Sequence, residues 1–273
     1  MSDFLQQMAL SSAARASHAR RKYGDDELDL PLLPLRLSGF DVIAEIKDHS
    51  PSEGVLAAAG SDRLQQARLY AAGGAAAVSV LTEPSRFAGD LQHLREVAAL
   101  LACAGIPVMR KDFLVDPVQI LEARAAGASG VLLIAAMQND RELAIMLDCA
   151  REHSLFVLLE AFDEDDLSRT ANLLEVQRFA EQADNGRLLV GVNTRNLRTL
   201  EVDPQRLQRL GALLPTAAAC VAESGLGSAE DVAAAAGWGY RLALVGSALM
   251  RSADPAGLIR DMRRAGLATG TTC

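Results

Sequence analysis

Residues 41–54 read DVIAEIKDHSPSEG, a stretch in which a short apolar run leads directly into charged residues. Its β-branched start is typical of a strand that is buried on both faces, and Pro51 and Gly54 prevent its continuation. Because alternate residues of a strand face the same side, Glu45 and Lys47 are expected to point together. For an isolated example, a surface ion pair at a frayed strand end would be sufficient. The rest of the chain decides between that interpretation and a functional one.

The length, charge and cysteine content exclude several classes of protein. With 273 residues, half of them hydrophobic, the chain is long enough for one α/β barrel or two ordinary domains. Its net charge of −8 disfavours nucleic acid as a partner but is compatible with a small anionic substrate in a local basic pocket. No apolar run approaches the length of a membrane span, and residues 1–12 lack the basic and apolar regions of a secretory signal. The four cysteines show no CxxC spacing, so we expect a cytoplasmic protein without a metal site or disulfide framework.

After Gly54, short Val/Leu/Ile runs alternate with Ala-rich helical stretches. This alternation indicates a parallel sheet covered by helices, and about eight repeats fit a single (β/α)8 TIM barrel. We therefore predict an α/β protein with a TIM barrel at 41–273 and an N-terminal helical extension at 1–40. An open doubly wound sheet is the alternative, but KDHSPSEG at 47–54 does not fit the GxGxxG turn of such sheets. The strands are expected at 42–47, 76–82, 107–111, 130–135, 155–160, 188–193, 220–224 and 242–247.

Polar residues stand at the C-terminal ends of most of these strands. TIM-barrel active sites form at that end of the barrel, because the βα loops meet there. One charged residue after an apolar run would mean little, but the whole set converges on one mouth. The predicted set comprises Glu45, Lys47, Lys111, Glu160, Asn193, Arg195, Glu223, Ser224, Gly225, Gly246 and Ser247.

The use of lysine sharpens this prediction. Only three of the 27 lysine and arginine residues are lysines, and two of them, Lys47 and Lys111, belong to the predicted mouth. Arginine stays charged, whereas lysine gives up and regains a proton when burial lowers its pKa. Two ordinary charges remain the simple alternative. The pattern favours a proton-transfer lysine and a substrate-anchoring lysine.

Two turns rich in small residues are candidates for phosphate binding. AESGLGSAED at 222–231 and LVGSALM at 244–250 each end a strand and lead into a helix, and Ser228 with Asp231 resembles a capping box. Backbone N–H groups at such turns bind phosphate, and TIM barrels commonly place this site after strands 7 and 8. Either turn alone would more often be a tight βα connection. Their occurrence in adjacent units favours a phosphate site.

An apolar wall is predicted on the other side of the mouth. Phe87 and Phe113 lie just beyond strands 2 and 3 in a chain with only 4% aromatic residues, and Leu132 and Ile134 share one face of strand 4. Core packing is the default role for such residues. Aromatic residues in βα loops at the mouth are nevertheless well placed to cover a flat apolar ligand.

Six segments together resemble indole-3-glycerol phosphate synthase, a family of tryptophan biosynthesis. The segments are AEIKDHSPSEG, VSVLTEPSRFAGD, RKDFLVDPVQI, GVNTRNLRTLEVD, VAESGL and LVGSALM, and they run in order from about residue 42 to 250. The resemblance implies a single TIM barrel with an N-terminal helical extension and no metal or organic cofactor. It also implies conversion of a carboxyphenylamino-deoxyribulose 5-phosphate to indole-3-glycerol phosphate, with loss of carbon dioxide and water.

The resemblance implies roles for the predicted site residues. Lys111 would be the general acid that polarises the ketone, and Glu160 would be the base or proton shuttle of the later steps. Glu45 would assist dehydration, Lys47 would neutralise the substrate anion, and Ser50 would hydrogen-bond the departing carboxylate. The remaining expected substrate contacts are Asn193 and Arg195 on the sugar chain, Ser224, Gly225, Gly246 and Ser247 on phosphate, and Phe87, Phe113, Leu132 and Leu197 on the ring, with Glu223 nearby.

The chain departs from the family pattern at a few places, and rival functions can be weighed on the same residues. Asp48, Thr194 and Asn196 differ from the usual residues, and the segment 167–187 is longer than usual.

A Schiff-base aldolase would carry its lysine where this chain has Asn193, and a phosphoribosyl isomerase would use an Asp or Cys at the end of strand 1. A barrel without catalysis that binds a phosphorylated ligand, or a paralogue of a specialised pathway, is the alternative. Other tryptophan-pathway enzymes are candidate partners, whereas nucleic acid and membranes are not expected.

Overall fold

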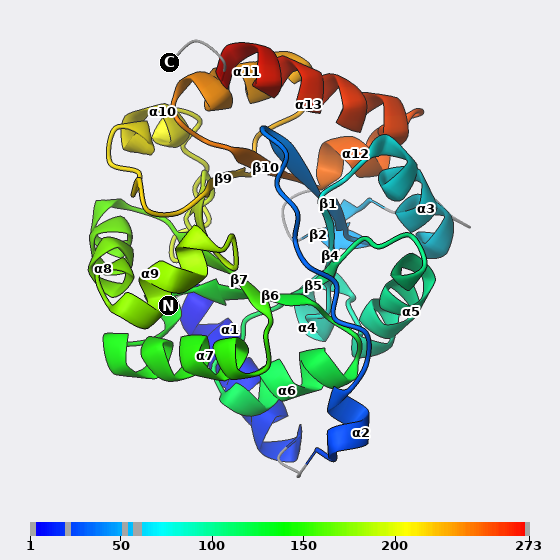
Figure 1. Cartoon of the computed structure of the whole chain (residues 1–273), viewed down its shortest axis with the longest axis vertical. Helices are drawn as coiled ribbons and strands as arrows, with labels where there is room; N and C mark the ends of the chain where they lie inside the picture. The colour runs from blue at the N-terminus through cyan, green and yellow to red at the C-terminus, as the bar shows by residue number, and fades with distance from the viewer. Residues whose placement is uncertain (1–3, 20–22, 51–53, 57–61, 271–273) are drawn as a thin grey trace.

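Eight parallel strands form a closed barrel in the computed structural model, which describes residues 4–19, 23–50, 54–56 and 62–270 (Figure 1). The barrel closes because β1 pairs with both β4 and β10, for example through Glu45 with Ser79 and Ile43 with Leu244. This confirms the predicted TIM barrel, and the strand bounds agree with the expected ones to within two residues. The strands are β1 (Asp41–Ile46), β4 (Ala77–Leu81), β5 (Val108–Lys111), β6 (Gly130–Ile134), β7 (Phe156–Ala161), β8 (Leu188–Asn193), β9 (Cys220–Glu223) and β10 (Leu242–Val245).

Helices surround the barrel, and polar caps fix where several of them begin. Asp62, Asp116 and Ser228 each accept a hydrogen bond from a backbone N–H of the first helical turn, and the predicted Ser228–Asp231 capping box is present. The longer helices are α3 (Arg63–Gly73), α5 (Leu91–Ala102), α6 (Pro117–Ala125), α7 (Asp140–Glu152), α8 (Glu164–Leu174), α9 (Gln177–Asp184), α10 (Arg206–Gly211), α11 (Ala229–Gly237) and α13 (Pro255–Gly270). Two short helices, α4 (Pro84–Phe87) and α12 (Ser247–Arg251), and the 3₁₀ turn η1 (Ala135–Met137) lie in βα connections.

The alternation of side chains along the strands produces two apolar clusters. One cluster lies between the strands and the helices, and Val42 and Ala44 of β1 belong to it. The other fills the barrel and includes Ile43, Met109 and Leu132. Glu45 has the same parity as Ile43, so its carboxylate points into the barrel rather than into solvent. The interpretation of Glu45 as part of a surface ion pair is therefore wrong.

A small hairpin follows β1 and was not predicted. β2 (His49–Ser50) pairs antiparallel with β3 (Gly54–Val55), so the chain turns back on itself where the sequence indicated only a break. Pro51, on which that prediction rested, lies outside the described residues. The imidazole Nδ1 of His49 is 2.8 Å from the carbonyl oxygen of Arg86, which ties the hairpin to α4.

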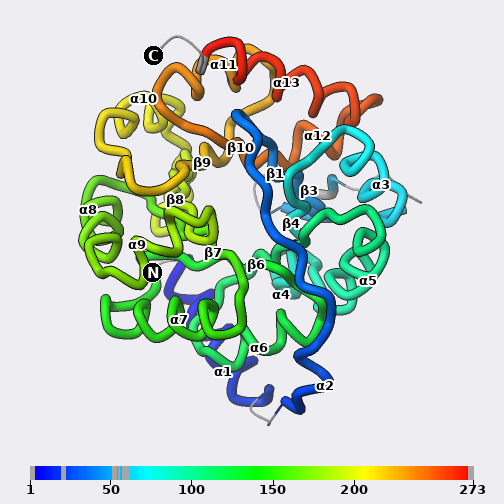
Figure 2. The backbone as a smooth tube through the Cα atoms, in the orientation of Figure 1, coloured from blue at the N-terminus to red at the C-terminus, as the bar shows by residue number. Residues whose placement is uncertain are grey.

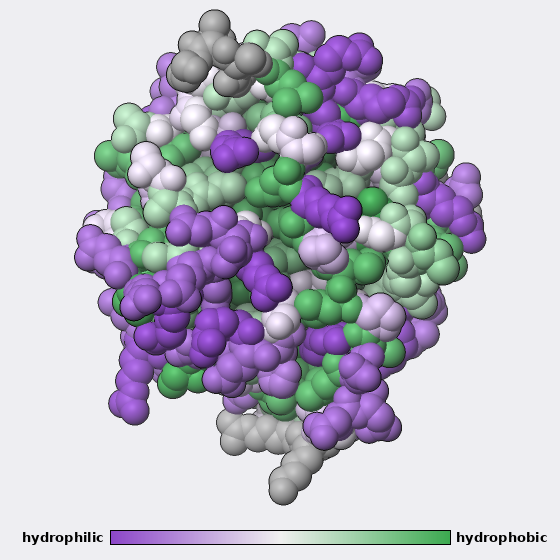
Figure 3. All heavy atoms as spheres, viewed as in Figure 1, coloured by the Kyte–Doolittle hydropathy of each residue, from purple (hydrophilic) through white to green (hydrophobic). Residues whose placement is uncertain are grey.

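The N-terminal segment contributes α1 (Phe4–Ala19) and α2 (Asp25–Leu28), followed by an extended link that enters β1. In Figure 2 this link crosses the near face of the barrel as the dark blue tube. On that face, hydrophilic and hydrophobic residues are interspersed (Figure 3). Leu5 and Met8 of α1 belong to the apolar cluster that fills the barrel, so α1 packs on the barrel itself. The division into an extension at 1–40 and a barrel at 41–273 stays a prediction.

Membrane-spanning helices require a long apolar run. Within the described ranges, every helix is too short or too polar to cross a bilayer.

Candidate active site

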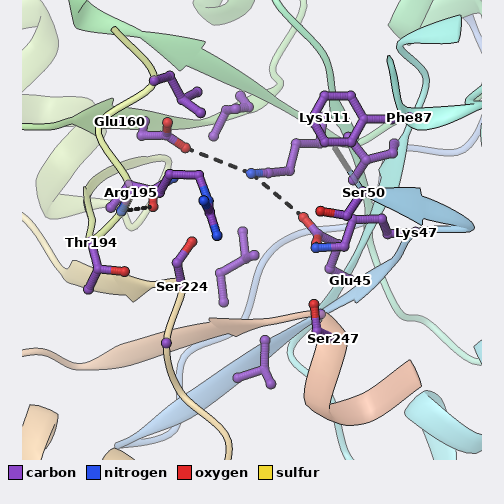
Figure 4. A pocket seen from close by; sticks show the side chains of 18 of the residues that line it. Glu45, Lys47, Ser50, Phe87, Lys111, Glu160, Thr194, Arg195, Ser224 and Ser247 are labelled. Atoms are coloured by element: carbon purple, nitrogen blue, oxygen red, sulfur yellow. Dashed lines mark hydrogen bonds and ion pairs between the residues drawn. The ribbon is translucent and has the colours of Figure 1, made fainter. Parts of the chain in front are cut away.

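A cavity of about 550 Å³ opens at the C-terminal ends of the strands and gathers fifteen of the sixteen predicted site residues (Figure 4). They reach it from β1, β5, β6, β7 and β8 and from the loops that follow the strands. The sixteenth residue, Glu223, does not line the cavity. The fifteen are Glu45, Lys47, Ser50, Phe87, Lys111, Phe113, Leu132, Glu160, Asn193, Arg195, Leu197, Ser224, Gly225, Gly246 and Ser247.

Glu45 holds both lysines of the site. Its carboxylate lies 2.9 Å from the Nζ of Lys47 and 3.6 Å from the Nζ of Lys111. Burial alone would raise the pKa of Glu45, but the charges of Lys47 and Lys111 outweigh it and lower that pKa. Glu45 is therefore an anion that fixes two ammonium groups at the mouth.

Lys111 sits among three carboxylates. Besides Glu45, its Nζ lies 3.8 Å from an oxygen of Glu160 and 3.8 Å from an oxygen of Glu223, and Figure 4 shows it between Glu160 and Glu45. Burial lowers the pKa of Lys111, but the charges of Glu45, Glu160 and Glu223 raise it further, and the net pKa is above its ordinary value. The expectation that burial gives this lysine a low pKa is wrong, because the carboxylates outweigh the burial. Lys111 is held charged in the free site.

Glu160 and Glu223 are both completely or almost completely buried, with residue exposures of 0% and 1%. Among the described residues, no hydrogen-bond partner satisfies either oxygen of either carboxyl group. Burial and, next, the charge of Glu160 raise the pKa of Glu223 well above its ordinary value. Glu160 reaches the cavity, whereas Glu223 lies beneath it, so the two carboxyl groups have different access to a ligand.

The two predicted phosphate turns lie side by side in the cavity wall. Ser224 and Gly225 both have positive φ angles, 66° and 73°, and a serine rarely adopts this conformation. Gly246 has a further constraint that the sequence did not indicate, because a Cβ at this position would overlap the carboxylate of Glu45. A glycine at 246 therefore leaves room for the carboxylate of Glu45 as well as forming the turn.

The apolar side of the cavity contains an aromatic residue that sequence reasoning missed. The rings of Phe87 and Phe113 are 6.1 Å apart, and the ring of Phe4 meets Phe113 edge-on at 6.0 Å. Phe4 belongs to α1, more than 80 residues before the nearest other aromatic of the group, so no local spacing connects it with the site. The scarcity of aromatic residues was its only sequence signal.

Most of the other lining residues were not singled out as part of the site; the exceptions are Ile134, expected on the apolar side, and Asp112 and Thr194, expected at strand ends. The loop after β8 supplies three of the further lining residues, and a backbone bridge between Arg195 and Val202 shapes that loop. Asn193 orients Arg195 by accepting a hydrogen bond from its backbone N–H at 2.9 Å. The further lining residues are Phe4, Leu81, Asp112, Ile134, Thr194, Leu200, Val202, Leu226, Gly227, Leu244, Val245, Ala248 and Arg251.

Asp112, next to Lys111, connects the site to the N-terminal helix. Its carboxylate accepts two hydrogen bonds from the guanidinium of Arg15, at 2.8 and 2.7 Å. It also accepts from Thr82 at 2.8 Å, from Arg110 at 3.1 Å and from the backbone of Phe113 at 2.8 Å. Five donors thus fix the residue between the general-acid candidate and the aromatic wall.

No metal site is evident in the part of the chain that the structure describes. Three or more His, Cys, Asp or Glu side chains are nowhere grouped there in a way that could hold an ion.

Comparison of the fold with solved structures agrees with the barrel. 3-Hexulose-6-phosphate synthase from Salmonella typhimurium superimposes with a TM-score of 0.58 and 17% identity, over 84% of this chain and 99% of the other. The dihydropteroate synthase of Yersinia pestis gives the same TM-score at 18% identity, over 87% and 95% of the two chains. At this level of identity the likeness concerns the fold alone.

Sequence comparison is more specific. The family model for indole-3-glycerol phosphate synthase matches residues 32–262. A protein named indole-3-glycerol phosphate synthase from Nocardioides sp. is 45% identical over 232 residues, which cover 85% of this chain and 83% of the relative. The protein of the same name from Mycobacteroides abscessus is 39% identical over 248 residues, covering 91% and 85%. With matches of this extent, the chain belongs to the indole-3-glycerol phosphate synthase family.

Proposed function

We propose that the cavity at the barrel mouth is where this chain carries out the reaction of its family. The reaction converts 1-(2-carboxyphenylamino)-1-deoxyribulose 5-phosphate to indole-3-glycerol phosphate, with loss of carbon dioxide and water. The chain is thus a carboxy-lyase of tryptophan biosynthesis and acts on a phosphorylated small molecule. The observation that carries the proposal is the position of Lys111, charged and held by carboxylates between an apolar wall and two phosphate-type turns.

The substrate would lie with its phosphate against Ser224, Gly225, Gly246 and Ser247. Backbone N–H groups at these turns are suited to phosphate oxygens. The aromatic ring would then rest against Phe87 and the neighbouring apolar side chains, away from the charged groups. This orientation places the ketone of the sugar chain near Lys111.

Ring closure would begin with attack of the aromatic carbon on that ketone. Lys111 would donate a proton to the ketone oxygen as the new carbon–carbon bond forms. Lys47 would offset the charge of the substrate carboxylate, and Ser50 would hydrogen-bond to it until carbon dioxide leaves. Loss of carbon dioxide restores the benzene ring. Glu160 would then carry a proton from the new five-membered ring to its hydroxyl group, which leaves as water with the assistance of Glu45 and completes the indole.

A direct assay tests this function. Purified protein incubated with the carboxyphenylamino-deoxyribulose phosphate should produce indole fluorescence. Lys111→Ala should abolish that signal while the variant still binds the substrate, because the phosphate turns and the apolar wall are unchanged. Absence of product from the folded wild-type protein, with binding intact, would instead support the alternative of a divergent barrel that only binds a phosphorylated ligand.

That alternative is not favoured. A silent barrel has no reason to retain Glu45, Lys47, Lys111 and Glu160 together, and buried charges are costly to keep without a role. A cytoplasmic location and contacts with other tryptophan-pathway enzymes stay predictions of the resemblance.

A further inference from the structure

The charged groups at the bottom of the cavity do not balance if all of them are ionised. Three carboxyl groups, Glu45, Glu160 and Glu223, meet two ammonium groups, Lys47 and Lys111. The neighbouring Asp112 does not alter this count, because its own cations, Arg15 and Arg110, bind it directly. Arg195 also lines the cavity, but its guanidinium donates to the carbonyl oxygen of Leu200 and not to these carboxylates. One excess negative charge would therefore remain in a site where burial makes unpaired charge costly. A single bound proton would make the cluster neutral.

Glu160 and Glu223 are the carboxyl groups with the least compensation. Glu45 has ammonium groups at 2.9 and 3.6 Å, whereas among the described residues Glu160 and Glu223 each have only Lys111, at 3.8 Å, and share it with Glu45. The residues paired with Glu223 in the sheet are Asn193 on β8 and Leu244 on β10, and both are uncharged. Facing it from β7 is Glu160, a like charge.

Strand β8 leaves room for the Glu223 side chain but gives it no charge partner. A Cβ on Gly191 would overlap an oxygen of Glu223, so the glycine allows this carboxyl group to lie against the strand. Glu160 lines the cavity and Glu223 does not, so of the two carboxyl groups only Glu160 faces a bound ligand. The proton that balances the cluster is thus best placed on Glu223.

We propose that Glu223 is protonated at neutral pH and acts as a neutral positioning residue beneath Lys111 and Glu160, not as a substrate ligand. This inference rests on the proposed roles of those two residues. When Glu223 is neutral, Glu160 is the anion that accepts a proton. A neutral Glu223 also avoids a further negative charge below an anionic substrate. Burial and the charge of Glu160, which both raise the pKa of Glu223, are in keeping with this assignment.

The first test compares Glu223→Gln with Glu160→Gln. Glutamine is close in shape to a protonated glutamic acid, so Glu223→Gln should keep kcat at pH 7 within about tenfold of wild type. Glu160→Gln should lose about a hundred- to ten-thousand-fold, the usual contribution of a general base. Wild-type kcat should fall at alkaline pH as Glu223 ionises, and Glu223→Gln should keep its activity to higher pH. An equal loss in both variants, or an unchanged alkaline limb in Glu223→Gln, would overturn the proposal.

The second test does not depend on activity. Infrared spectra of the wild-type protein at pH 7 should contain a C=O stretch of a buried protonated carboxyl group. That band should disappear in Glu223→Gln and persist in the control Glu96→Gln, which changes an exposed glutamate of α5. Glu160→Gln removes the like charge that raises the pKa of Glu223, so this variant should weaken the band. A wild-type spectrum without the band, or a band that persists in Glu223→Gln, refutes the assignment. If the band behaves as expected but no indole forms, the proposed function fails while the protonation of Glu223 stands.

Discussion

Asp112→Asn should destabilise the protein strongly, because Asp112 is the point at which the N-terminal helix, β4 and β5 meet. The carboxylate is 2% exposed and accepts hydrogen bonds from Arg15, Thr82, Arg110 and the backbone of Phe113. Asparagine keeps the shape but removes the negative charge, and one of its two polar atoms becomes a donor that faces other donors. The guanidinium of Arg15 then loses its carboxylate partner, and that of Arg110 keeps only Glu122.

The magnitude follows from the pKa of Asp112. Burial alone would raise this pKa, but hydrogen bonding to Arg15 and the charge of Arg110 outweigh it, so the pKa falls from 3.8 to about 2. A fall of this size corresponds to about 2 kcal/mol of stability, present above the unfolded pKa and lost as the pH falls from about 4 to about 2. Removal of one partner of a buried pair costs about 3–5 kcal/mol, because the stranded charges add their own penalty. We therefore expect Asp112→Asn to lower the free energy of unfolding by about 3 kcal/mol at pH 7.

Urea unfolding at pH 7, repeated at intervals down to pH 2, measures both effects. The matched control is Asp148→Asn, since Asp148 binds Arg178 and Arg151 at the surface and should contribute less than about 1 kcal/mol. The difference between wild type and Asp112→Asn should shrink toward acid pH, because the wild-type carboxylate is then neutralised too. A free energy of unfolding for Asp112→Asn within about 1 kcal/mol of wild type at pH 7 would contradict the reasoning.

Substitutions at four further positions test the site. Lys111→Arg and Lys111→Ala should both lower kcat by about a hundred- to ten-thousand-fold with little change in KM, whereas Lys47→Arg should chiefly change KM. If Lys111→Arg turns over within a few fold of wild type, Lys111 is not the general acid. Gly246→Ala should lower kcat as well as weaken phosphate binding, because the added Cβ displaces Glu45, and a change in KM alone would show that the turn tolerates it. Phe4→Ala should raise KM several-fold in steady-state assays, with kcat nearly unchanged, and an unaltered KM would mean that this ring does not contact the substrate.

The barrel was predictable from sequence because the alternation of apolar strands and helices that produces it repeats along the chain. Strands buried on both faces must be short and continuously apolar, and helices between them must follow, so eight such units leave few alternatives. The helix start at Ser228 was visible for a similarly local reason, since a cap acts within one helical turn. The β2–β3 hairpin was not visible, because Pro51 and Gly54 signal a break without showing how the chain continues.

The site was predictable in so far as it follows from strand ends. Side chains at the C-terminal ends of parallel strands meet whatever the loops do, and this brought fifteen expected residues to one cavity. Phe4 and the pair of Arg15 with Asp112 were missed, because the partners are joined only by the packing of α1 on the barrel, which no local pattern encodes. The position of Glu223 was also not predictable, because the alternation of side chains along a strand does not show whether a residue lines the cavity.

The direction of the pKa shift of Lys111 is the point on which sequence reasoning failed, and it bears on how a lysine works here. A raised pKa would hinder a lysine that must act as a base or a nucleophile, because the neutral amine would be rare. An acid faces the opposite requirement: it must carry its proton when the substrate arrives. As the aromatic carbon attacks the ketone, the ketone oxygen gains alkoxide character and becomes more basic than an amine, so even an ammonium group with a raised pKa transfers its proton downhill. Glu45 and Glu160 thus keep Lys111 protonated, whereas arginine, whose positive charge is delocalised over the guanidinium, would hold its proton through the same step.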